Sequence, residues 1–404
     1  MKKKISLSTF IISIAVAVVI TFNTTYTLLN SRHNKENAEL LTQKGFLSTL
    51  LTVDEIIRTS YSGKIDDEAL KDAAVRGYLE GLGDKYSAYM TSEEYEAYKA
   101  ESLGNTVGIG INVIYDSASG TIEIIEVVQD SPAEEAGLLP SDFLVAIDGI
   151  RISEVGYYAA LDLIRGEEGS TVIITVKRGE TELDFTCKRA PVKVFTVKYR
   201  QHSVNTNVGI IRISSFYSTT PAEVKQAVEE LQNLGCDRFV FDLRYNGGGE
   251  LTSIVKTLDY LLPEGKITDV YYAQGTKRSY TSDSNCLNAS IAVLVNKSTA
   301  SAAELFAAAL RDYAKEGKYD ATLVGTTTYG KGVFQTIYEL SDGSAFKISC
   351  GRYDPPCGVN YDGVGVVPDI IEDLSEEAKN INFYKLNDET DNQLALAVSK
   401  LCSK

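Results

Sequence analysis

Residues 239–249 read FVFDLRYNGGG, an apolar run that ends in a cluster of three glycines. The run before the glycines has the length and composition of a buried strand. Upstream, residues 208–213 form a second such run, and residues 222–234 place their apolar side chains on one helical face. Strand, helix and strand in this order predict a parallel crossover, and therefore an α/β fold.

The three glycines precede a predicted helix at residues 252–262. Such a turn can bind phosphate, but the chain has neither a following Lys-Ser/Thr pair nor a GxGxxG motif here, so nucleotide binding lacks support. A tight turn is one interpretation. The other is that Gly247 and Gly248 bring backbone N–H groups close to a reacting carbonyl oxygen.

A third strand, residues 291–295, leads through Thr299 and Ala300 to Ser301 and an alanine-rich helix. Ser301 and Glu304 have the spacing of a capping box, so Ser301 could simply cap the helix. A nucleophile at the same place would profit from the helix dipole and from the free N–H of Ala302. These residues alone leave both interpretations open.

Lys331 lies between two glycines and ahead of residues 333–340, whose composition favours a strand. A spacing of four along a strand places Lys331 and Gln335 on one face. To act as a base the lysine must be neutral, which requires desolvation to lower its pKa from ~10.4 to ~7–8. This shift corresponds to a free energy of ~4 kcal/mol. Gln335 could then orient the amine without adding a charge. We therefore expect the Lys331 amine within proton-sharing distance of the Ser301 hydroxyl.

Composition narrows the chemistry further. The two histidines, His33 and His202, lie in polar segments, so we expect them to be solvated rather than catalytic. A formal charge of -15 disfavours nucleic acid as a partner. The six cysteines form no CxxC motif, so we expect no metal site and free, mostly buried thiols; Cys350 and Cys357 are the one pair close in sequence.

Between residues 103 and 191 the pattern changes to short β-rich runs with two helical pieces. The expected strands are residues 107–113, 121–127, 143–147, 172–176 and 183–187, and the expected helical pieces are residues 132–137 and 157–164. At the start of this segment, a loop of alternating apolar residues and glycines can aim consecutive N–H groups at one anion. The loop consists of Val107, Gly108, Ile109, Gly110 and Ile111.

Residues 131–138, SPAEEAGL, are followed by Asp142 and by Ile147-Asp148-Gly149, and together they resemble the signature of PDZ domains. The resemblance implies a peptide-binding module that adds a C-terminal peptide to its sheet as an extra strand. It also implies that the loop of residues 107–111 captures the carboxylate of that peptide.

The N-terminus combines three lysines, Lys2 to Lys4, with an apolar run at residues 5–22. This arrangement predicts a membrane-directing segment, with an uncleaved signal anchor favoured and a cleaved signal peptide as the alternative. Retained lysines would place the rest of the chain outside the cytoplasm. The following residues show helical periodicity, which predicts a small helical cap or a dimerisation arm, and hence a homodimer as a candidate assembly.

The serine, lysine and glutamine together resemble the site of the carboxy-terminal processing proteases, also called tail-specific proteases. The resemblance extends over nearly the whole chain, with further motifs at residues 81–90, 242–249, 296–304, 328–335, 353–369 and 391–394. It implies that Ser301 is the nucleophile, Lys331 the general base and Gln335 the residue that orients the lysine, with no cofactor. Ala303 stands where the family usually has serine, and Lys85 where it usually has proline.

We therefore expect a multi-domain α/β protein with a crotonase-like peptidase core, an inserted PDZ-like β-rich domain and an N-terminal helical region. The expected segments are 1–30 (signal anchor or signal peptide), 31–99 (helical), 100–190 (PDZ), 191–370 (peptidase core) and 371–404 (C-terminal helical segment).

The expected function is that of a membrane-attached serine endopeptidase with its catalytic part outside the cytoplasm, or exported if the signal is cleaved. It would bind protein or peptide tails with a free, apolar C-terminus and cleave upstream of them. Backbone N–H groups of Ala302, Gly247 and Gly248 would hold the oxyanion. Arg165 would link the loaded PDZ domain to the core, with a plain surface arginine as the alternative. The rival functions are a membrane-anchored PDZ scaffold with an inactive core and an acyl-CoA enzyme of similar core fold.

Overall fold

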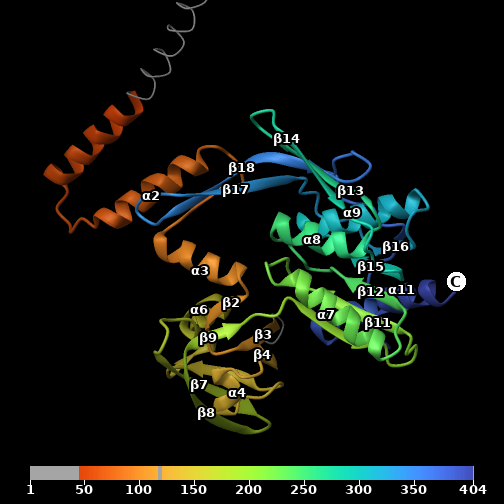
Figure 1. Cartoon of the computed structure of the whole chain (residues 1–404). Helices are drawn as coiled ribbons and strands as arrows, with labels where there is room; N and C mark the ends of the chain where they lie inside the picture. Colours follow the sequence, from red (N-terminus) through yellow and green to blue (C-terminus); the bar gives the residue numbers. More distant parts are fainter. Residues whose placement is uncertain (1–44, 117–120, 404) are drawn as a thin grey trace, which may run out of the picture. The chain divides into compact units, whose positions relative to one another are not determined.

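A computed structural model of the chain describes residues 45–116 and 121–403 (Figure 1). The chain divides into two compact units, residues 1–74 and 75–404. The first unit contains a helix over residues 45–60 and the start of α2 (Asp67–Glu80). The predicted anchor at residues 1–30 and His33 lie outside the described residues. Within the described part, no helix is long and apolar enough to span a membrane.

The segment after α2 departs from the helical pattern predicted for it. Residues 81–90 do not continue the helix but turn at Gly83, which has a φ of +68°, and form the short strand β1 (Ala88–Met90). Glycine is a poor helix former, and the aromatic residues that follow suit a strand. Helix α3 (Ser92–Ser102) then begins at a capping box formed by Thr91 and Glu94.

The β-rich domain contains one antiparallel sheet and three short helices, of which α5 and α6 contact the middle strand β5 and α4 contacts the edge strand β8. The sheet has the order β3-β4-β5-β7-β8, and a separate pair is formed by β2 and β9. The strands are β2 (Asn105–Gly108), β3 (Ile111–Asp116), β4 (Thr121–Val127), β5 (Phe143–Ile147), β6 (Ile150–Arg151), β7 (Thr171–Arg178), β8 (Thr181–Lys188) and β9 (Ala190–Lys193). The helices are α4 (Pro132–Ala136), α5 (Ile152–Val155) and α6 (Tyr157–Ile164).

The one strand predicted over residues 107–113 is in fact two, β2 and β3, which are separated at Ile109 and Gly110. Gly110 has a φ of +83°, and a Cβ at this position would lie 2.3 Å from the Ser131 Cβ. The backbone therefore bends where a larger residue would not fit. Ile109 is 1% exposed and packs in the core of the domain.

The large sheet of the second unit is the α/β part that the crossover pattern predicts. Its order is β10-β11-β12-β15-β16-β19, with β10 antiparallel and the other neighbours parallel. The strands are β10 (Val197–Gln201), β11 (Val208–Ile213), β12 (Arg238–Asp242), β15 (Ser290–Val295), β16 (Ala321–Gly325) and β19 (Ile370–Ile371). The connecting helices are α7 (Thr220–Asn233), α8 (Leu251–Leu261) and α9 (Ala302–Lys315).

Both faces of this sheet are covered, because alternate side chains of its strands point to opposite sides. On β11, Ile211 and Ile213 join the core formed with α7, α8 and α9, whereas Ile210 packs with the C-terminal helix α11 (Asn392–Cys402). Figure 1 shows α7, α8 and α9 beside the strands β11, β12 and β15. Two short helices, α10 (Glu376–Lys379) and a 3-10 turn (Phe383–Lys385), precede α11.

A second, antiparallel sheet carries residues of the predicted site. Its order is β1-β18-β13-β14, and β17 also pairs with β18. Its longer strands are β13 (Gly265–Tyr272), β14 (Lys277–Ser282), β17 (Val333–Glu339) and β18 (Ala345–Asp354). Gln335 lies on β17 opposite Ser349 of β18, so the two strands fix its position along the sheet.

All six cysteines are free, but the prediction that they are mostly buried holds for only half of them. Cys187, Cys236 and Cys350 are buried, whereas Cys357 and Cys402 are exposed.

Candidate active site

The predicted residues gather where three neighbouring parallel strands end. The glycine turn follows β12, Ser301 follows β15, and Lys331 follows β16. Loops at the carboxyl ends of adjacent parallel strands necessarily lie at one edge of the sheet. Backbone hydrogen bonds join the loops: the Ala300 N–H donates to the Asn246 carbonyl at 2.9 Å, and the Tyr329 N–H donates to the Thr299 carbonyl at 3.0 Å.

Ser301 occupies a strained turn at the start of α9. Its φ is +58° and its ψ is -121°, a conformation that costs a non-glycine residue on the order of 1–3 kcal/mol. The Glu304 carboxylate accepts the Ser301 N–H at 2.9 Å, as the capping box predicts. The Ser301 hydroxyl is bonded to Tyr353. Ser301 therefore caps the helix through its backbone N–H and the Glu304 carboxylate, while its hydroxyl contacts Tyr353.

Lys331 lies just before β17 rather than on it, since the strand begins at Val333. Its Nζ donates to Gln335 Oε1 at 2.9 Å, which is the contact that the spacing of four predicts. Gln335 Nε2 in turn donates to Ser349 Oγ at 3.0 Å, which fixes the amide so that its oxygen faces the lysine. Among the hydrogen bonds of the described residues, none joins Lys331 Nζ to Ser301 Oγ.

The electrostatic surroundings of Lys331 favour its neutral form. Burial, followed by the nearby charge of Lys347, lowers the pKa of the Lys331 amine. Asp84, Tyr329 and Glu304 act in the opposite direction without reversing the shift.

An aromatic ring lies against the same amine. The Nζ of Lys331 is 4.5 Å from the centre of the Tyr86 ring, which comes from the loop between α2 and β1. A cation over a ring face is attracted to it, so this contact holds the amine when it is charged.

Glu304 is the buried residue that joins the nucleophile loop to the base loop. Its side chain is fully buried. One carboxylate oxygen accepts the N–H groups of Ser301 and Lys331, at 2.9 and 2.7 Å. The other accepts the Thr328 hydroxyl and the Gly330 N–H, both at 2.6 Å. Four donors satisfy a buried carboxylate and fix the two backbones relative to each other.

The predicted oxyanion donors have different surroundings. Gly248 lies against the nucleophile, since a Cβ there would be 2.7 Å from the Ser301 Cβ. Its N–H, however, donates to Asn246 Oδ1 at 2.8 Å and is not open to a substrate in this arrangement. Gly247 is exposed, and the described hydrogen bonds give neither its N–H nor that of Ala302 an acceptor. The oxyanion prediction therefore rests on Ala302 and Gly247, and its Gly248 part needs correction.

The predicted peptide-binding loop also needs one correction. Val107 and Gly108 close β2, and Ile111 opens β3, so the turn between them consists of Ile109 and Gly110. Within residues 45–116 and 121–403, the backbone N–H groups of Ile109 and Gly110 have no acceptor. They fit the predicted capture of an anion. The Ile109 side chain is buried and cannot select an apolar tail, whereas Val107 is 37% exposed.

Arg165 follows α6 and is largely exposed, with Asp162 at 3.6 Å as its ion-pair partner. This position corresponds to the alternative of a surface arginine. The arginine of this region that is buried and hydrogen-bonded is Arg189, which sequence reasoning missed. It is 7% exposed and donates to the carbonyl groups of Leu163 and Ile164 at 2.8 Å.

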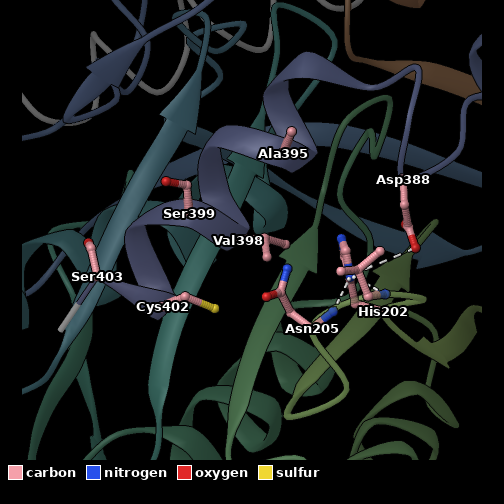
Figure 2. Close-up of a pocket in the computed structure, with 9 residues that line it drawn as sticks. His202, Asn205, Asp388, Ala395, Val398, Ser399, Cys402 and Ser403 are labelled. Carbon is pink, nitrogen blue, oxygen red and sulfur yellow. Dashed lines mark hydrogen bonds and ion pairs between the residues drawn. The ribbon is translucent and has the colours of Figure 1, made fainter.

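A pocket of about 560 Å³ lies apart from these residues, between α11 and the β10–β11 turn (Figure 2). None of the predicted site residues lines it. His202 in this pocket is 5% exposed, contrary to the prediction of a solvated residue. Its Nδ1 accepts the N–H groups of Val204 and Asn205, so it stabilises the turn. Within the described residues, no cluster of histidine, cysteine and carboxylate side chains is suited to a metal ion.

Sequence reasoning missed the hydroxyl that contacts the nucleophile. Tyr353 Oη lies 3.2 Å from Ser301 Oγ and 3.1 Å from the Lys331 carbonyl oxygen. From the sequence, Tyr86 was only one residue of the motif at residues 81–90, and Glu304 was only part of the capping box with Ser301. Neither pattern showed their contacts with Lys331. The available signal was that Tyr353 belongs to the strand that follows β17, but the register of β17 and β18 was needed to place its side chain.

Comparisons with known proteins agree with this arrangement. Residues 207–371 match the model of peptidase family S41, residues 123–178 that of the PDZ domain, and residues 15–94 that of the N-terminal domain of the activating protease CtpB. A "Probable CtpA-like serine protease" of Staphylococcus aureus strain COL is 31% identical over 397 residues, covering 96% of this chain and 76% of that protein. One of the same name from Staphylococcus haemolyticus strain JCSC1435 is 32% identical over 317 residues, covering 78% and 62%.

Two solved structures are similar. The structure of a "Putative S41 protease" from Bacteroides fragilis NCTC 9343 has a TM-score of 0.56 and 18% identity, over 87% of this chain and 97% of that one. The photosystem II D1 C-terminal processing protease has 28% identity and a TM-score of 0.48, over 80% and 86%. From the identity and coverage of the staphylococcal relatives, together with the matched peptidase and PDZ regions, the chain belongs to peptidase family S41 and is a CtpA-like serine protease with a PDZ domain.

Proposed function

We propose that this serine protease works with a Ser301/Lys331 dyad and cleaves polypeptides whose C-terminal tails bind to its PDZ domain. The observation that supports the dyad most is the buried Glu304 carboxylate, which accepts the backbone N–H groups of both residues. Nucleophile and base are thereby parts of one hydrogen-bonded unit. Burial lowers the pKa of Lys331, which shifts its amine toward the neutral form that a base requires.

The reaction is acyl transfer. The Ser301 O–H bond breaks as its proton moves to Lys331 Nζ, and Oγ bonds to the substrate carbonyl carbon. The N–H groups of Ala302 and Gly247 stabilise the negative oxygen that results. Lys331 then gives the proton to the leaving amine as the C–N bond breaks and the carbonyl re-forms. In the second half Lys331 takes a proton from water, the water oxygen bonds to the acyl carbon, and the C–Oγ bond breaks as Oγ regains its proton.

One side-chain movement is part of this proposal. Lys331 Nζ is bonded to Gln335, and Ser301 Oγ to Tyr353, so the proton transfer requires the amine to turn toward the serine. The lysine side chain has four rotatable bonds, and its backbone is held by Glu304. The movement that we propose is a rotation of the Lys331 side chain.

Tail binding is the second half of the proposal. The N–H groups of Ile109 and Gly110 would hold the carboxylate of the substrate, and Val107 and Ile111 would contact its last, apolar side chain. The expected location at the membrane, outside the cytoplasm, rests on residues 2–22 alone and remains part of the proposal.

A homodimer is also proposed, and the exposed apolar residues of the first unit support it. They include Leu51, which is 69% exposed, and Ile56, which is 57% exposed.

The test is cleavage of a disordered protein that ends in an apolar residue, followed by mass spectrometry of the products. Wild type should cleave it, and Ser301→Ala should not. Cleavage by Ser301→Ala at the wild-type rate would refute the dyad, whereas no cleavage by the wild type would favour the PDZ scaffold with an inactive core or the acyl-CoA enzyme. The same substrate with an amidated C-terminus should be cleaved more slowly; an unchanged rate would refute carboxylate capture but not the dyad.

A further inference from the structure

Tyr353 places a buried hydroxyl on the reacting atom of the proposed mechanism. The residue lies near the end of β18 and is 3% exposed. Its Oη is 3.2 Å from Ser301 Oγ and 3.1 Å from the carbonyl oxygen of Lys331. Among the described residues, Tyr353 is the hydrogen-bond partner of the Ser301 hydroxyl. One side chain therefore contacts the nucleophile and the backbone of the base.

The backbone of Tyr353 is fixed by the same loops. Its N–H donates to the Gly332 carbonyl at 3.2 Å, one residue after the lysine. Its carbonyl accepts the Asn360 amide at 2.9 Å, and that amide also donates to Gly332 at 3.1 Å. The hydroxyl is thus presented to Ser301 from a position that does not depend on the rotation of the Lys331 side chain.

The number of protons restricts what this hydroxyl can do. A phenol has one proton and two lone pairs, and the Lys331 carbonyl can only accept. The one phenol proton can be donated either to the Lys331 carbonyl oxygen or to Ser301 Oγ, because both acceptors lie within hydrogen-bond distance of Tyr353 Oη. When the serine proton has moved to Lys331 Nζ, Oγ can only accept. The Tyr353 proton can then turn from the carbonyl oxygen to Oγ without leaving the phenol.

We propose that Tyr353 is a further catalytic residue, whose hydroxyl holds Ser301 Oγ before attack and donates a hydrogen bond to it once its proton is on Lys331. The inference rests on the proposed dyad. Burial raises the pKa of the Tyr353 phenol well above its ordinary value, so the hydroxyl is a donor throughout the neutral range. Charge on Oγ develops in acylation and again when Oγ leaves in deacylation, so both steps use this donor.

The chain offers a matched control. Tyr361 is 4% exposed, and its ring lies 6.1 Å from the Tyr353 ring in an edge-on arrangement. Among the described hydrogen bonds, none joins its hydroxyl to Ser301 or Lys331, and its influence is on the Tyr353 phenol beside it. Tyr361→Phe therefore removes a buried phenol oxygen from the same cluster without removing a contact to Ser301.

The experiment compares the full chain with Tyr353→Phe, Tyr361→Phe and Ser301→Ala. Steady-state cleavage of a disordered protein gives kcat and KM. The second-order rate of reaction with a small fluorophosphonate measures Ser301 alone, because Oγ bonds to phosphorus, fluoride leaves and Lys331 takes the proton. Tyr353→Phe should lower kcat and the phosphonylation rate by about tenfold or more, with KM changed by less than about twofold. Tyr361→Phe should match wild type.

A chain with 2,3,5-trifluorotyrosine at position 353 tests the donor without removing the hydroxyl. Its phenol is more acidic, so the alkaline loss of kcat should move to lower pH than in wild type. An alkaline loss of kcat at the same pH as in wild type would overturn the inference. This result is decisive even if Tyr353→Phe does not fold. Equal kcat for Tyr353→Phe and Tyr361→Phe would overturn it too, as would a loss confined to KM. Ser301→Ala separates the two claims: full activity in that variant refutes the dyad itself, whereas its inactivity beside an active Tyr353→Phe refutes only the role of Tyr353.

Discussion

Lys331 is the residue whose charge affects both activity and stability. Its pKa is lowered by burial and by Lys347, so the folded protein releases this proton at lower pH than the unfolded chain, whose lysine keeps the ordinary value of 10.5. Between the two values the unfolded state binds more protons, so the free energy of unfolding rises with pH. Below the lowered pKa of Lys331 this rise in the free energy of unfolding is absent.

We predict that Lys331→Met lowers kcat by at least about a thousandfold, because the serine loses its base. The wild-type kcat should rise with pH along a limb whose pKa lies below 10.5. The variant should also lack the alkaline gain in the free energy of unfolding, as measured by urea titrations across the neutral and alkaline range. A wild-type rate limb that is unchanged in Lys331→Met would assign the ionisation to another group.

Glu304 gives a second prediction at this scale. Replacing its carboxylate by an amide in Glu304→Gln turns an NH2 group toward backbone N–H donors, so at least one buried donor loses its partner. We expect a loss of about 1–3 kcal/mol in the free energy of unfolding, together with a fall in kcat, because the two loops are no longer fixed together. Glu316→Gln, at the other end of the same helix and ion-paired with exposed Lys318, should change neither. Equal effects of the two variants would contradict the role assigned to Glu304.

At the scale of elements, the site depends on how closely the loop after β12 approaches the start of α9. In Gly248→Ala the new Cβ would lie 2.7 Å from the Ser301 Cβ and 2.9 Å from the Ala302 nitrogen. Both atoms belong to a rigid turn, so we predict strong loss of kcat as well as stability. Gly235→Ala is the control: it has a similar φ of +93°, but its Cβ meets no atom within 4 Å. Gly235→Ala should lower the stability but not kcat. Activity assays and thermal melting of both variants measure the difference.

Elements with a clear pattern were predictable from sequence, and close contacts between distant elements were not. The crossover of β11, α7 and β12 and the contact between Lys331 and Gln335 follow from periodicity and spacing. The division of residues 107–113 into two strands depends on the approach of Ser131 to Gly110, which no local pattern records.

The same limit applies to the site. Ser301 was recognised as either cap or nucleophile because both functions use one local motif. Tyr353 was not recognised, because its contact with Ser301 spans 52 residues and depends on strand register. His202 was wrongly predicted to be solvated, since polar neighbours in sequence did not reveal that α11 and the adjoining loop bury it.

At the scale of the whole molecule, one buried arginine attaches the C-terminal helix to the large sheet. Arg244 follows β12 and is 4% exposed. It bonds to both carboxylate oxygens of Asp242 and of Asp391, the N-cap of α11, at distances of 2.7–3.0 Å. Helix α11 covers one face of the sheet, so this network stabilises the half of the core that α11 completes.

We predict that Arg244→Met lowers the free energy of unfolding by about 3–5 kcal/mol, because it leaves two buried carboxylates without their partner. Arg151→Met, whose exposed side chain faces Glu182 at 3.6 Å, should change it by less than about 0.5 kcal/mol. Chemical denaturation of both variants measures the difference. Similar small losses would mean that the apolar contacts of α11 suffice without the arginine.

The central claim is that Ser301 forms the covalent bond to the substrate. It is tested most directly by mixing excess full-length enzyme with a disordered protein substrate, quenching in acid within a single turnover and measuring the intact mass. The account predicts an added acyl group that peptide mapping locates on Ser301 and that Lys331→Met does not form. Complete cleavage with no adduct at any time, or an adduct on another residue, would contradict it.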